Sequence, residues 1–128
     1  MKILIDTQVF LWWISDNPNI SSKFHDVMSE PRNEIYFSAA SGWEIAVKAK
    51  IGRLSIQGDP QKFIPTQLSL NSITVLPIQI SHTLQTYHLP EHHKDPFDRL
   101  IIAQSQIENM PIATNDALFK NYEVDLIW

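Results

Sequence analysis

The chain has 128 residues, with 10 basic and 14 acidic side chains, so its net charge is −4 when the histidines are neutral. This length predicts one domain covering residues 1–128, and the acidic balance excludes a protein that holds nucleic acid by bulk positive charge. With no cysteine, the chain cannot form disulfides, iron–sulfur clusters or thiolate zinc sites, and a reducing cytoplasm is the expected location. We also expect no signal peptide and no membrane segment, because no apolar run approaches about 18 residues.

Short apolar runs alternate with helical patterns along the chain. The first part of the chain predicts a strand at Lys2–Ile5, helices at Gln8–Ser15 and Ser21–Ser29, a strand at Glu34–Phe37 and a helix at Ser38–Ile51. Next come a helix that opens at Asp59-Pro60 and that Pro65 kinks or divides into two pieces, a strand at Ser72–Leu76, a helix at Ser81–Tyr87 and a polar loop at Leu89–Lys94. The last part predicts a helix from Asp95 to Asn109, a strand at Met110–Ala113, a helical turn at Asn115–Lys120 and an edge strand at Val124–Trp128. This alternation is typical of an α/β fold built on a mostly parallel sheet.

Acidic residues follow the predicted strands. Asp6 comes directly after the first strand, Glu44 follows the second within two helical turns, Asp98 lies at the start of the long helix, and Asp116 follows the fourth strand. In a parallel sheet, ligands bind outside the carboxyl ends of the strands. We therefore expect these four carboxylates to face one crevice.

Each acid also has a structural explanation. Ser41-Gly-Trp-Glu44 matches a capping box, and Glu44 could instead pair with Lys48 one turn later. Asp98 suits the dipole of a helix that begins at Pro96, and Asp116 fits the same pattern. Asp95 stands before Pro96 and is the expected N-cap, which leaves the Asp98 side chain free to project toward the strand ends.

Taken together, the four acids favour a metal site. Several unpaired carboxylates within a few ångströms repel one another, and a divalent cation removes that conflict. Oxygen ligands without cysteine suit Mg²⁺ or Mn²⁺, and such sites activate water for phosphodiester cleavage.

Four segments resemble, in order, the successive motifs of PIN domains, and most closely the VapC-type toxins of bacterial toxin–antitoxin pairs. They are Leu4-Ile5-Asp6-Thr7, Ser38–Ser41 with Trp43-Glu44-Ile45, Asp95–Ala103, and Thr114-Asn115-Asp116. The resemblance covers nearly the whole chain. Pro65 departs from it, because the family has an unbroken helix at that point.

This resemblance implies a three-layer α/β/α PIN-like fold with a mostly parallel sheet of four to five strands. It also implies a Mg²⁺- or Mn²⁺-dependent endoribonuclease that acts on an RNA substrate and is inhibited by a cognate protein antitoxin. A homodimer is expected on a separate ground, because the Gln8–Ser15 helix carries more apolar residues than one core face can use. The family's acidic residues carry over to Asp6, Glu44, Asp98 and Asp116, with Asp6, Asp98 and Asp116 as metal ligands. The family's hydroxyl after the fourth strand carries over to Thr114, which would shape the site.

The remaining polar candidates are weaker. His88, His92 and His93 cluster in one segment, but no HExxH pattern is present and a solvated loop is favoured over a zinc site. Lys48, Arg53 and Arg99 could form a basic rim for RNA phosphates or could belong to solvated helix faces.

Three tryptophans carry expectations about packing. Trp43, Val47 and Ile51 recur at helical spacing, so we expect Trp43 to lie in the core. Trp12 and Trp13 are adjacent and cannot easily face one core, so we expect one of them to contact a partner chain.

Two rival functions can be distinguished from this nuclease. The first is a catalytically silent PIN-like binding module. The presence of all four acids argues against it, and a metal-dependent nuclease assay separates it from the nuclease. A phosphoacceptor receiver-like domain would need paired acids at the first strand, where Asp6 stands alone beside Thr7-Gln8.

Overall fold

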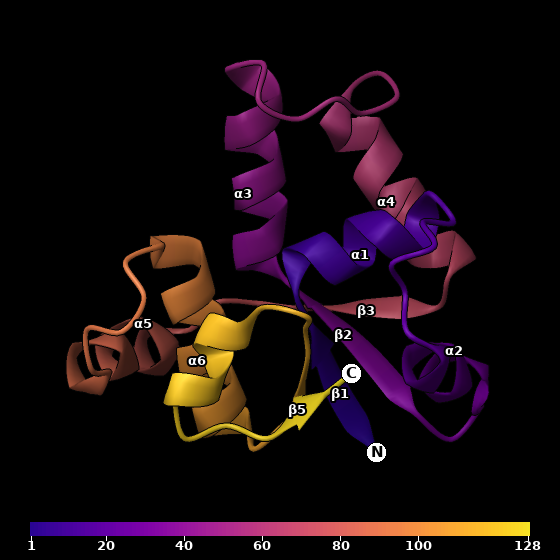
Figure 1. Cartoon of the computed structure of the whole chain (residues 1–128). Coiled ribbons are helices and arrows are strands. Elements are labelled where there is room, and N and C mark those ends of the chain that lie inside the picture. Colours follow the sequence, from indigo (N-terminus) through magenta and orange to yellow (C-terminus); the bar gives the residue numbers. More distant parts are fainter.

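Five parallel strands form one sheet at the centre of the computed structural model, which describes residues 1–128 (Figure 1). The strands are β1 (Lys2–Ile5), β2 (Glu34–Ser38), β3 (Ile73–Leu76), β4 (Ile112–Ala113) and β5 (Leu126–Ile127). Their spatial order is β3-β2-β1-β4-β5, with Leu4 of β1 aligned with Tyr36 on one side and Ile112 on the other. The predicted parallel α/β architecture, including the edge strand near the C-terminus, is confirmed.

Helices fill the connections between the strands. They are α1 (Thr7–Ile14), α2 (Ser22–Ser29), α3 (Ala39–Lys50), α4 (Pro60–Leu70), α5 (Ile80–Gln85) and α6 (Pro96–Glu108), with short 3₁₀ helices η1 (Thr86–His88) and η2 (Ala117–Asn121). Most begin at a side-chain cap, in which a carboxylate or hydroxyl accepts a backbone N–H of the first turn. None of the helices combines the length and the hydrophobicity that a bilayer-spanning segment needs.

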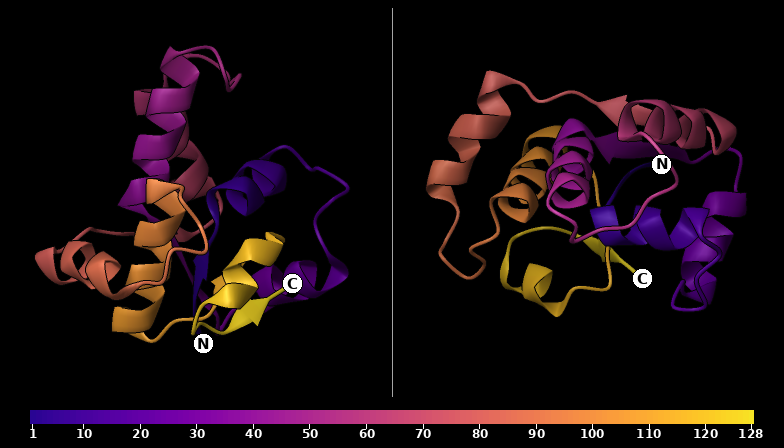
Figure 2. Two further views of the ribbon diagram at one scale, coloured as in Figure 1. Left: turned by 60° about the vertical axis from the view of Figure 1, so that its left-hand side comes forward. Right: turned by 90° about the horizontal axis from the view of Figure 1, so that it is seen from above.

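The sheet is apolar on both faces, which makes three layers. In β1, Ile3 and Ile5 point into one core with α1, α2 and α4, whereas Leu4 points into a second core with α6 and η2. Figure 2 shows α5, α6 and α3 side by side, with α6 in the middle. Because both faces are covered, the strands are continuous apolar runs rather than alternating ones.

The order of the strands makes the connections run to opposite sides of β1, and they diverge at its carboxyl end. The chain leaves β1 toward β2 and β3 on one side and later returns to β4 and β5 on the other side. A parallel sheet binds its ligand at such a switch point. The ends of β1 and β4 therefore mark the place to look for a site.

The sequence predicts that Pro65 kinks its helix or divides it into two pieces. The division into two pieces is wrong. α4 is one continuous helix with Pro65 inside it. Proline removes a single intrahelical hydrogen bond there. The neighbouring Ile64 and Leu68 are buried in the first core, and this packing stabilises the helix on both sides of the proline.

The expectation that Trp43 lies in the core is also wrong, since 60% of its surface is exposed. The face of α3 that packs inward carries Ala40, Ser41, Glu44 and Ile45 instead. Trp43 rests edge-on against Phe97 of α6, with ring centroids 5.0 Å apart. Val47 and Ile51, the other members of its stripe, are exposed too.

Candidate metal-binding nuclease site

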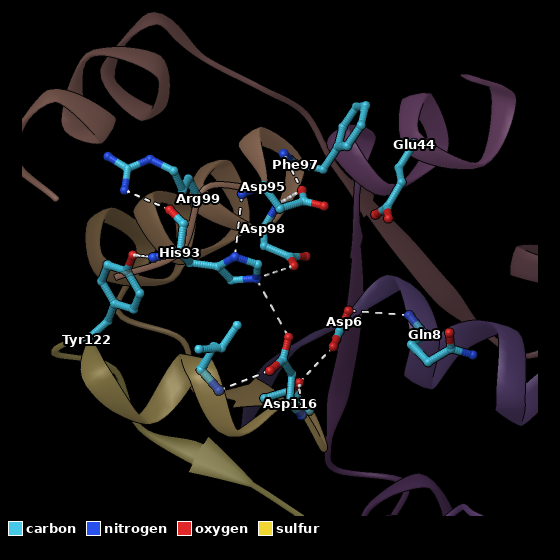
Figure 3. Close-up of polar contacts among 12 residues, drawn as sticks. Asp6, Gln8, Glu44, His93, Asp95, Phe97, Asp98, Arg99, Asp116 and Tyr122 are labelled. Atoms are coloured by element: carbon cyan, nitrogen blue, oxygen red, sulfur yellow. Dashed lines mark hydrogen bonds and ion pairs between the residues drawn. The ribbon is translucent and has the colours of Figure 1, made fainter. Parts of the chain in front are cut away.

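Asp6 begins α1 directly after β1. One of its carboxylate oxygens accepts the backbone N–H of Gln8 at 3.3 Å, and the other accepts the hydroxyl of Thr114 at 2.6 Å (Figure 3). Asp6 is 6% exposed, and its burial raises the pKa of the carboxyl above the usual value, although these two hydrogen bonds act in the opposite direction. The charges of Glu44 and Asp116 raise that pKa further.

Glu44 lies on the inward face of α3. Its Oε2 pairs with Lys48 Nζ at 2.5 Å, so the predicted pair one turn apart is present. The capping-box alternative is wrong, because Ser38 caps α3 and the Ser41 hydroxyl instead accepts a hydrogen bond from Thr7.

Oε1 of Glu44 is buried and has no hydrogen-bond partner. A buried carboxylate oxygen without a partner is costly and indicates that a group is needed there.

Asp95 and Asp98 have different roles at the start of α6. Asp95 is the N-cap, and its Oδ1 accepts the backbone N–H groups of Phe97 at 2.9 Å and Asp98 at 3.0 Å, as predicted. Asp98 turns its carboxylate toward the ends of β1 and β4 (Figure 3). Burial, followed by the charges of Asp6, Asp95, Glu44 and Asp116, raises the pKa of Asp98 to about 8.

Thr114 links Asp6, which follows β1, to Asp116, which follows β4. Its hydroxyl donates to Asp6 and accepts the backbone N–H of Asp116 at 3.0 Å. Asp116 caps η2 through its Oδ1, which accepts from Leu118 at 2.9 Å, and its Oδ2 points back to the crevice (Figure 3). Thr114 thus contacts both Asp6 and Asp116 through its hydroxyl, which is consistent with the predicted role of shaping the site.

The acids line one cavity of about 410 Å³. Lys48 and Arg53 lie along its wall, where a basic rim was predicted. Arg99 does not line it. Its guanidinium donates to the backbone carbonyl oxygens of Thr86 in η1 and of Leu89, Pro90 and His93 in the loop before α6. Arg99 therefore holds this loop in place, and few of its donors are left for a phosphate.

The prediction of a solvated loop holds for His88 and His92, which are exposed, but it is wrong for His93. The His93 side chain is 13% exposed, and its Nε2 lies 2.7 Å from Asp98 Oδ2 and 3.6 Å from Asp116 Oδ2. No local pattern in the sequence distinguishes His93 from the adjacent His92.

The residues of this cavity fit a divalent cation. The donors are carboxylate oxygens, which hard cations such as Mg²⁺ and Mn²⁺ prefer. Oε1 of Glu44 is unpartnered, and burial, with a further contribution from the neighbouring carboxylates, raises the pKa values of Asp6 and Asp98. A bound cation would stabilise the ionised form of these groups. Asp6, Glu44, Asp98 and Asp116 are brought together here, as the sequence predicts.

No curated protein matches the chain significantly. The fold is similar to solved structures of VapBC2 from Rickettsia felis bound to a promoter DNA fragment (TM-score 0.73, 17% identity, 99% of this chain and 98% of that one) and VapBC-1 from nontypeable Haemophilus influenzae (TM-score 0.67, 15% identity, 99% and 97%). It is also similar to FitAcB from Neisseria gonorrhoeae (TM-score 0.66, 17% identity, 98% and 96%). The family model of the PIN domain matches residues 3–124, so the chain belongs to the PIN-domain family.

Proposed function

We propose that this protein is a Mg²⁺- or Mn²⁺-dependent endoribonuclease and the VapC-type toxin of a toxin–antitoxin pair. The observation that carries this proposal is the convergence of Asp6, Glu44, Asp98 and Asp116, from four separate segments, on one cavity. The unpartnered Oε1 of Glu44 within it supports the need for a bound group.

Asp6, Asp98 and Asp116 would hold the metal, with Asp6 and Asp98 as the direct ligands. When bound, the metal would supply the positive charge that activates water and stabilises the phosphorane-like transition state of phosphodiester hydrolysis. Glu44 would orient the attacking water through Oε1, because its Oε2 is already paired with Lys48.

Lys48 and Arg53 would contact the RNA backbone. Both line the cavity beside the acids, and a chain with a net charge of −4 needs local positive charge to approach a phosphate. Thr114 would hold Asp6 in place through its 2.6 Å hydrogen bond.

Cleavage of RNA by the purified protein tests the proposal. With Mn²⁺ or Mg²⁺ the wild-type chain should cut single-stranded RNA or tRNA internally, and with EDTA it should not. Asp6→Asn should lower the rate by more than the roughly 10–100-fold that loss of an outer-shell partner costs. A folded wild-type chain that binds RNA but cuts none with either metal would contradict the proposal and favour the catalytically silent PIN-like module.

We also propose a cognate antitoxin as the partner that keeps the nuclease inactive in the cytoplasm. The solved structures with a similar fold include a toxin–antitoxin complex from Klebsiella pneumoniae, which supports this proposal. The partner contact predicted at Trp12 or Trp13 remains a prediction. Trp12 is half-buried beside Trp128 and lines the acidic cavity, whereas Trp13 donates to Asn71 at 3.0 Å and packs on Phe24.

A homodimer remains a prediction, and we place it on the apolar stripe of α3. Trp43, Val47 and Ile51 are exposed along one face of this helix, and exposed apolar patches of this kind mark interfaces. Ile51→Glu should convert a dimer to a monomer in light scattering without lowering the unfolding midpoint of the monomer. Leu70→Glu, at an equally exposed apolar site at the end of α4, should leave the mass unchanged. A monomeric wild type, or a dimer that survives Ile51→Glu, would contradict this placement.

A further inference from the structure

We propose that His93 is a positioning residue for the metal-binding carboxylates, and that its Nε2–H fixes the orientation of Asp98. This inference rests on the proposed function, because it assigns Asp98 to the metal.

The backbone of His93 is held on both sides although the surrounding loop has no regular structure. Its N–H donates to the hydroxyl oxygen of Tyr122 at 2.7 Å, and its carbonyl oxygen accepts from Arg99 Nη1 at 3.2 Å. Tyr122 also donates to the carbonyl of Pro90 at 3.0 Å, and Arg99 donates to it at 2.9 Å. Two largely buried side chains from different segments therefore immobilise this loop at His93.

The imidazole of His93 has contacts of its own on the side away from Asp98. Nδ1 accepts the backbone N–H of Asp95 at 3.4 Å, and the ring lies edge-on to Phe119 with centroids 6.1 Å apart. A nitrogen that accepts a hydrogen bond carries no proton, so the N–H of the ring is Nε2–H. Nε2–H thus donates to Asp98 Oδ2 at 2.7 Å, with Asp116 Oδ2 farther away at 3.6 Å (Figure 3).

This hydrogen bond leaves Asp98 one carboxylate oxygen for a metal. In Figure 3 the Asp98 carboxylate lies between the His93 ring and the side of the crevice that carries Asp6 and Glu44. Carboxylates that bind metals are themselves hydrogen-bonded, and such partners orient the ligand. Nε2 itself has no free lone pair in this tautomer, so His93 acts through Asp98 rather than as a ligand.

Mn²⁺ binding to the purified full chain tests this role without reference to activity. His93→Ala should weaken the Mn²⁺ affinity measured by calorimetry about 10–100-fold. His93→Gln, whose side-chain amide can still donate to Asp98, should recover part of the loss. His92→Ala, at the exposed neighbouring position, should bind as the wild type does. Pulsed electron paramagnetic resonance of the Mn²⁺-loaded wild type should show no directly coordinated nitrogen.

Three results would overturn the inference. They are unchanged affinity in His93→Ala, an affinity of His93→Gln no better than that of a folded His93→Ala, and a nitrogen coupling in the wild type that His93→Ala removes. The third result would make His93 a ligand. A wild-type chain that binds no Mn²⁺ at all would instead overturn the proposed function on which the inference rests, so the two failures are distinguishable.

Discussion

Asp98→Asn is expected to abolish RNA cleavage and, above about pH 8 without metal, to raise the thermal unfolding midpoint. Asn keeps the shape of the side chain and removes the charge that the proposed metal needs, so cleavage is lost. The same substitution removes a buried negative charge that lies among Asp6, Asp95, Glu44 and Asp116, so the folded state gains stability. Loss of activity together with a gain in stability is a combination that a purely structural residue does not give.

Asp95→Ala provides the matched control three residues earlier. Asp95 accepts two backbone N–H groups at the start of α6, so its loss should cost about 0.5–2 kcal/mol of stability while cleavage persists. The rate of cleavage and the unfolding midpoint of both variants would be measured side by side. A stable but inactive Asp95→Ala together with an active Asp98→Asn would reverse the assignment.

The metal-free chain is expected to lose stability as pH rises, and Mn²⁺ is expected to restore it. The pKa of Asp98 is about 8 in the folded chain, against roughly 3.9 for an unperturbed aspartate. Its contribution to the free energy of unfolding is therefore fully present below about pH 4 and is lost as pH rises through about 8. The raised pKa of Asp6 acts in the same direction. The loss is on the order of a few kcal/mol for the metal-free chain.

Mn²⁺ binds only the folded site in this account, so it should restore stability most strongly at high pH, where the acids are ionised. At a concentration of about 100 times its dissociation constant, it should add about 2.7 kcal/mol. Thermal unfolding from acidic to basic pH, with and without Mn²⁺, measures both effects. The pH dependence should flatten in Asp98→Asn. A midpoint that rises with pH in the metal-free wild type, beyond the change seen in Asp98→Asn, would contradict the predicted titration.

The location of the acids could be predicted because each follows from a local pattern and the sheet is parallel. Asp6 ends an apolar strand, and Pro96 separates the cap at Asp95 from the helical Asp98. The carboxyl ends of parallel strands meet at one edge, so residues far apart in the chain converge there. The roles of these residues as ligands remain predictions.

The errors arose where tertiary packing decides between local alternatives. Periodicity indicates an apolar stripe on α3, but it does not show that Ala40, Glu44 and Ile45 are the residues that pack inward. The position of His93 depends on side chains of Tyr122 and Arg99, which the sequence separates from it by 29 and 6 positions. No repeating pattern marks such an irregular loop.

Anomalous diffraction from crystals grown with Mn²⁺ tests the central claim, that the four acids form one divalent cation site. We expect an anomalous peak in the crevice, within coordination distance of carboxylate oxygens of Asp6 and Asp98, and no peak there in Asp98→Asn. An empty crevice at saturating Mn²⁺, or a peak whose ligands include neither Asp6 nor Asp98, would contradict it.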